Sequence, residues 1–146
     1  MLRHGFYKDR PALILEQGDR SACFLPEDGG KLVSLRVGER EILAQRQGAC
    51  YRRLLPDTSY VKAECSAFDD MFPTIDPCEI NGKRYLDHGE VSRLPWEAIA
   101  DGDTLTLTCH LQEINAEFSK VITLCDGVLT LVYRMTNHTA APLPCL

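Results

Sequence analysis

The sequence predicts an all-β protein built as an antiparallel β-sandwich. Three observations support this fold class. Residues 104–111 alternate strictly between apolar and threonine-rich positions, which is the period of a half-buried strand. Turn-forming pairs such as Asn-Gly and Asp-Gly separate short apolar runs along the chain. No segment keeps a helical period over three turns. Short strands joined by tight turns are typical of sandwiches.

The first half of the chain contains a series of short predicted strands. Residues 12–16 and 21–25 flank a Gln-Gly-Asp-Arg turn, and residues 27–30 then reverse the chain. A further hairpin is expected from residues 32–37 and 41–43 around Gly38-Glu39. Residues 79–85 form another, with Asn-Gly at its tip. Residues 45–77 are irregular, and long irregular loops in compact β domains often carry function.

The second half carries the clearest strands. In residues 104–111, Leu105, Leu107, Cys109 and Leu111 share one face, and three threonines with His110 occupy the other. Residues 118–124 and 128–135 flank Cys125-Asp126-Gly127, and Asp-Gly between such runs favours a tight hairpin because both positions tolerate positive φ. We therefore expect one domain over residues 1–146, a length that can bury about 68–70% of the unfolded surface.

Composition excludes several classes of protein. Apolar residues make up 45% and charged residues 25%, as in folded globular domains. The net charge of −5 argues against a nucleic-acid binder. No apolar run is long enough for a membrane span or resembles a secretory signal, so no membrane partner and a cytoplasmic location are expected. The seven cysteines lack C-x-x-C spacing and the four histidines are scattered, which predicts buried thiols and no metal site.

Two segments outside the strands combine titratable and aromatic residues. The first is residues 68–74 (FDDMFPT), and the second is residues 87–90 (DHGE) followed by Arg93 and Trp96. His88 can donate or accept hydrogen bonds near neutral pH, and Trp96 offers an aromatic platform for a flat ligand such as a sugar ring. Two alternatives stay open, namely a polar turn at Asp-His-Gly-Glu with Trp96 in the core, and a solvated turn at Asp69-Asp70.

These segments carry a resemblance to a known superfamily. Residues 26–35 (PEDGGKLVSL) resemble the early hairpin of the galactose mutarotase-like superfamily. Residues 68–75 and 87–90 with Leu94-Pro95-Trp96 resemble, in order, two motifs of its aldose 1-epimerase-related members. Residues 131–137 with Pro142-Leu143-Pro144 resemble the central strand and the loop after it. The resemblance implies a large antiparallel sandwich, of which this chain is expected to be the N-terminal portion.

The resemblance also implies an activity and a site. Aldose 1-epimerases interconvert sugar anomers by general acid–base catalysis, without a cofactor. By position, His88 matches a histidine that contacts substrate hydroxyls, Asp70 an acidic residue at the pocket edge, and Arg93 and Trp96 the cleft lining. The family's catalytic histidine and glutamate are expected beyond Leu146. The ligand is then a sugar or sugar phosphate.

Two other functions remain open at this stage. The chain could be a non-catalytic sugar-binding module, since fold alone does not decide function. It could instead be a sandwich interaction module that forms a homodimer through an exposed sheet edge, because half a sandwich leaves unpaired strand edges.

Overall fold

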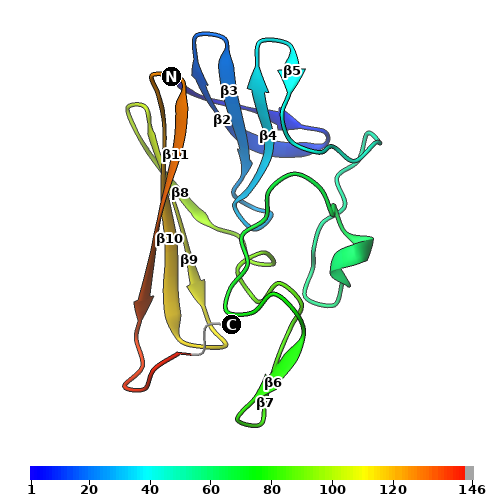
Figure 1. Ribbon diagram of the computed structural model, residues 1–146, viewed down its shortest axis with the longest axis vertical. Helices are drawn as coiled ribbons and strands as arrows, with labels where there is room; N and C mark the ends of the chain where they lie inside the picture. Colours follow the sequence, from blue (N-terminus) through cyan, green and yellow to red (C-terminus); the bar gives the residue numbers. More distant parts are fainter. Residues whose placement is uncertain (144–146) are drawn as a thin grey trace.

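The computed structural model describes residues 1–143 and confirms an all-β fold of antiparallel sheets. The first sheet has the order β1-β2-β3-β4-β5, and the second has the order β11-β10-β9-β8. A small hairpin, β6-β7, stands apart from both. Figure 1 shows the two main sheets as separate layers, with β6-β7 projecting at the opposite end from the turns of the first sheet. The sandwich prediction is therefore confirmed.

The predicted strands appear at similar bounds, and residues 2–7 and 97–101 form two further strands that the sequence pattern did not indicate. The first sheet is formed by β1 (Leu2–Tyr7), β2 (Arg10–Gln17), β3 (Arg20–Leu25), β4 (Lys31–Val37) and β5 (Arg40–Glu41). The small hairpin is formed by β6 (Cys78–Ile80) and β7 (Lys83–Tyr85). The second sheet is formed by β8 (Glu97–Asp101), β9 (Thr104–Leu111), β10 (Ala116–Cys125) and β11 (Val128–Asn137). A single helical turn, η1 (Tyr60–Lys62), interrupts the long loop between β5 and β6.

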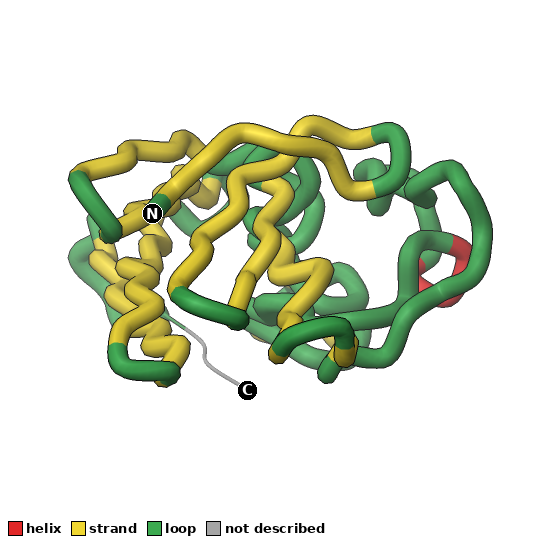
Figure 2. The backbone as a smooth tube through the Cα atoms, turned by 90° about the horizontal axis from the view of Figure 1, so that it is seen from above, coloured by secondary structure: helices red, strands yellow, loops and turns green. Residues whose placement is uncertain are grey.

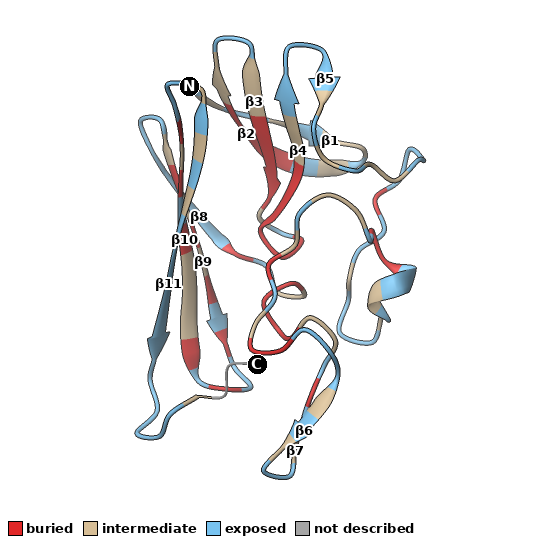
Figure 3. Cartoon of the chain, in the orientation of Figure 1, coloured by how far each residue is buried: buried red, intermediate tan, exposed pale blue. Residues whose placement is uncertain are grey.

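The main core lies between the two sheets. Leu13, Leu15 and Phe24 from the first sheet meet Leu105 and Leu107 from the second, and all are buried. The predicted face of residues 104–111 is the face that β9 turns inward, because apolar alternation along a strand puts every second side chain on one side. Figure 3 shows the buried positions of β2, β3 and β4 concentrated at the ends of these strands nearest the central loops.

The first sheet is also covered on its other face. A second cluster joins Ala12, Ile14, Cys23 and Leu25 to Tyr51 of the long loop. This explains why residues 12–15 are apolar without alternation, since a strand that is buried on both faces has no wet side. Figure 2 shows the loop and η1 extending to one side of the strands. None of the helices within residues 1–143 is long and apolar enough to cross a membrane.

Candidate functional site

The structure brings the two motif segments together. An isolated parallel bridge joins Phe72 to Gly89, and the Glu90 amide donates to the Phe72 carbonyl over 3.1 Å. The His88 amide donates to the Ile75 carbonyl over 2.9 Å. Gly89 has φ +66°, and a Cβ there would lie 1.9 Å from the Phe72 carbonyl oxygen. Only glycine therefore allows the segment that carries His88 to approach the Asp-Asp segment this closely.

His88 is held in a defined orientation. Its Nδ1 lies 2.5 Å from Oδ1 of Asp87, and its ring stacks on Tyr60 with centroids 3.6 Å apart and planes 16° from parallel. His88 itself has φ +62°, so its backbone occupies a left-handed conformation. A carboxylate at Nδ1 fixes the imidazole and leaves Nε2 to face other groups. Among the described residues, Nε2 has no hydrogen-bond partner.

Asp69 links the histidine to a buried lysine. The Tyr60 hydroxyl donates to Oδ2 of Asp69 over 2.8 Å, and Nζ of Lys31 lies 3.0 Å from the same oxygen. Lys31 also donates to the Glu64 carbonyl over 2.5 Å. Burial, strengthened by the bond to Asp69, raises the pKa of Tyr60 above its ordinary value. The phenol therefore stays protonated and acts as a fixed donor to the Asp69 carboxylate.

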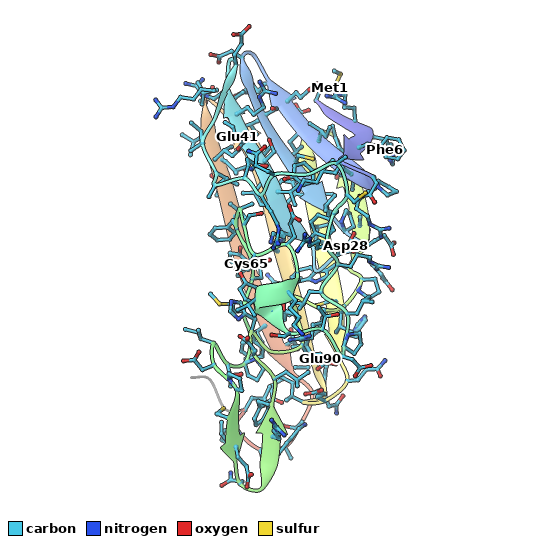
Figure 4. All side chains as sticks on the ribbon, turned by 90° about the vertical axis from the view of Figure 1, so that its right-hand side faces the viewer. Met1, Phe6, Asp28, Glu41, Cys65 and Glu90 are labelled. Carbon is cyan, nitrogen blue, oxygen red and sulfur yellow. The ribbon has the colours of Figure 1, made fainter. Side chains whose placement is uncertain are left out.

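These groups surround an open pocket of about 390 Å³. Phe68 and Met71, which are 45% and 43% exposed, form an apolar lip. In Figure 4, Cys65 is labelled beside η1, on the face of the molecule turned to the viewer. We call this cavity the His88 pocket; it is lined by Ala44, Tyr60, Cys65, Ser66, Ala67, Phe68, Asp69, Met71 and His88.

Asp70 points away from the His88 pocket and into the sandwich. Its Oδ2 lies 2.5 Å from Nζ of Lys120 on β10, and its Oδ1 accepts from the Tyr133 hydroxyl on β11 over 2.6 Å. Lys120 is fully buried and also donates to the Gly30 carbonyl over 2.7 Å. Its ammonium lies 4.9 Å from the Trp96 ring centroid. Burial lowers the pKa of Lys120, opposed by the adjacent Asp70 carboxylate. Asp70 thus ties the motif segment to the second sheet.

Arg93 and Trp96 have extensive contacts of their own. Nη1 of Arg93 donates to the carbonyls of Leu55 and Thr58 over 2.8 and 2.9 Å, and Nη2 donates to the Asp87 carbonyl over 3.1 Å. The guanidinium therefore fastens the long loop to the segment before His88. Trp96 is 2% exposed within the main core, and its indole donates to the Val91 carbonyl over 2.9 Å.

The structure thus separates the four predicted site residues. His88 lines the pocket, whereas Asp70 and Arg93 lie behind it as positioning groups and Trp96 lies in the core. The substrate contacts predicted for Asp70, Arg93 and Trp96 stay predictions, since the contacts observed for them are structural. The sequence pattern did not indicate Tyr60 or the role of Lys31, because an irregular loop carries no periodic signal that would place Tyr60 beside His88.

Two expectations on metals and thiols can be compared with the structure. Within residues 1–143, no group of three or more His, Cys, Asp or Glu side chains is arranged to hold a metal ion. Cys23 and Cys109 are buried, as expected for core thiols, but Cys50, Cys65 and Cys125 are exposed. The prediction of buried thiols is therefore wrong for these three. Cys50 and Cys65 lie in the long loop, and Cys125 is the last residue of β10. Cys145 and the expected catalytic groups beyond Leu146 lie outside the described residues.

Comparison with known proteins gives a likeness in structure. No family model matches the chain, and no curated protein matches it in sequence. The chain is similar to a region of the 4-alpha-glucanotransferase from Thermococcus litoralis, with a TM-score of 0.55 and 14% identity. The match covers 92% of this chain and 24% of that enzyme, so this chain spans about a quarter of its length. At this identity the likeness shows a shared fold.

Proposed function

We propose that the His88 pocket binds a sugar. The observation that carries this proposal is the stacked Tyr60–His88 pair beside the carboxylate of Asp69. Sugars present apolar C–H faces that pack on rings and hydroxyls that donate to carboxylates, so one ligand satisfies both features. A pocket of about 390 Å³ lies in the range used for small ligands. The shared fold with part of an enzyme that is named a glucanotransferase agrees with this class of ligand.

The finer proposal is an aldose 1-epimerase-like role. In that reaction a base removes the anomeric hydroxyl proton, an acid protonates the ring oxygen, and the ring opens and recloses on the other face. His88, fixed by Asp87, offers one nitrogen for proton exchange with a bound hydroxyl. The motif resemblance implies that the main acid and base lie beyond Leu146. The alternative is a sugar-binding module without catalysis, which needs only the contacts of the pocket.

Calorimetric titration with glucose and galactose tests the binding proposal. We expect His88→Ala to weaken the affinity on the order of tenfold, which corresponds to ~1.4 kcal/mol, because both the ring stack and a hydrogen-bonding nitrogen are lost. The matched control is His110→Ala, since His110 lies on the exposed face of β9 and its side chain is 63% exposed. Equal affinity in the wild type and His88→Ala would overturn the site.

Polarimetry on freshly dissolved α-glucose separates the two finer proposals. An epimerase role predicts the buffer rate for this chain alone. It predicts a faster rate for a longer form that carries the expected acid and base, and a fall of that rate in His88→Ala. A binding module predicts the buffer rate for both forms, with the calorimetric signal retained. The two measurements together therefore show whether the epimerase proposal or the binding proposal has failed.

A further inference from the structure

A second cleft lies between the margins of the two main sheets. It has a volume of about 480 Å³ and shares no lining residue with the His88 pocket. Buried Ala12, Leu13 and Trp96 form an apolar floor. Strand β1, whose Phe6 is labelled in Figure 4, borders the cleft through His4. We call this cavity the β8 cleft; it is lined by His4, Pro11, Ala12, Leu13, Pro26, Glu27, Pro95, Trp96, Glu97 and Ala98.

Strand β8 offers an unpaired backbone edge along this cleft. Within residues 1–143 it is the last strand of its sheet and pairs with β9 on one side only. All five of its residues are exposed, and Ile99 is 67% exposed. Edge strands of this kind accept an added strand from another chain, which then gains main-chain hydrogen bonds. The floor of the cleft would receive every second side chain of such a strand.

The register of β8 defines what the two faces of an added strand would meet. Ala98 pairs with Leu107, whose side chain points into the core, so the Ala98 side faces the cleft. Glu97 pairs with Thr108, on the outer face. Asp101 shares that outer face, because it lies four residues further along the strand. An added strand therefore meets apolar surface on one face and carboxylates at both ends of the other.

The carboxylates at the β8 cleft indicate which kind of strand it would bind. Glu27 lines the cleft, Glu97 borders it from the outer face of β8, and within residues 1–143 none of the lining residues is Lys or Arg. Self-pairing of two β8 strands, antiparallel about Ile99, would place Glu97 opposite Asp101 of the other copy. Like charges that face each other across strands destabilise the pair. The cleft therefore disfavours a second copy at this edge and favours a cationic strand.

We propose that the β8 cleft binds an extended peptide segment of alternating apolar and basic residues by strand addition to β8. Its apolar side chains pack on Ala12, Leu13 and Trp96, and its basic side chains lie beside Glu97 and Asp101. The proposal stands independently of sugar binding in the His88 pocket, because the two cavities have separate linings.

The test uses a short acetylated peptide of alternating valine and lysine. Trp96 is the only tryptophan, so its fluorescence reports on the floor of the cleft directly. We expect the lysine peptide to shift Trp96 emission and a valine–glutamate peptide to leave it unchanged. Backbone N-methylation of the lysine peptide removes its main-chain donors and is expected to abolish the shift. Equal responses to all three peptides would overturn strand addition.

Substitutions in the protein also test strand addition to β8. Glu97→Lys is expected to weaken binding of the lysine peptide by up to about fivefold, the range of one exposed ion pair, and it leaves the core untouched. His88→Ala is the control that leaves peptide binding unchanged. Unchanged affinity in Glu97→Lys, a Trp96 shift produced by sugars in place of the peptide, or concentration-dependent wild-type dimers in light scattering that Glu97→Lys strengthens would each overturn the proposal.

Discussion

Replacement of Gly89 by alanine tests how the two motif segments are joined. A Cβ at this position would lie 1.9 Å from the Phe72 carbonyl oxygen and 2.4 Å from the carbonyl carbon, both backbone atoms that cannot rotate away. The segment must move, and the hydrogen bond from the Glu90 amide to Phe72 breaks. Alanine in the left-handed region costs ~1–2 kcal/mol. The lost hydrogen bond adds about 1 kcal/mol.

Gly102→Ala is the matched control. Gly102 also has positive φ, at +57°, but a Cβ at this position would meet no atom within 4 Å. Both variants therefore carry the conformational cost, and only Gly89→Ala carries the clash. Urea unfolding followed by circular dichroism is expected to show Gly89→Ala less stable than Gly102→Ala by at least about 1 kcal/mol, the size of the broken bond. Equal destabilisation of the two variants would refute the close approach of the segments.

Three further outcomes follow from the buried groups. Lys120→Met leaves the buried Asp70 carboxylate without its cation, and urea titration is expected to show a free energy of unfolding lower by ~3–5 kcal/mol. Adding Asp70→Asn removes the buried charge and is expected to reduce this loss. Burial raises the pKa of Glu90, so the folded state binds the carboxyl proton more tightly than the unfolded state does. As the pH falls from the raised folded pKa to the ordinary 4.5, the wild type should therefore gain stability relative to Glu90→Gln, and below 4.5 the difference should stay constant. Urea midpoints measured over this pH range test the prediction. Burial raises the pKa of Cys23 and Cys109 to about 12, so iodoacetamide at pH 7 followed by mass spectrometry should spare both and label the exposed thiols, Cys50, Cys65 and Cys125.

The strands with clear alternation could be predicted from the sequence. β9 spans the predicted residues 104–111, and the Asp126-Gly127 turn joins β10 to β11 with φ of +49° and +77°. The sequence did not indicate β1 or β8. β8 reads Glu-Ala-Ile-Ala-Asp and is exposed throughout, so its pairing depends on β9 and on no apolar pattern of its own.

The candidate site, like the fold, could be predicted from the sequence only in part. His88 and the Asp-Asp segment stand out because titratable groups, glycine and aromatics occur together in a few residues. Tyr60 lies twenty-eight positions before His88, and their stacking results from the fold of the long loop. The sequence left Trp96 open between a ligand platform and the core, and the structure places its side chain in the core between the two sheets.

The measurement that tests sugar binding most directly is an NMR titration of the isotope-labelled chain with glucose and galactose. The account predicts shifts of the Tyr60, His88 and Asp69 resonances that saturate together, and none at Ala12 or Ala98 of the β8 cleft. It also predicts that His88→Ala removes these shifts and that His110→Ala keeps them. Saturable shifts confined to other residues, or no shifts with either sugar, would contradict a sugar site at His88.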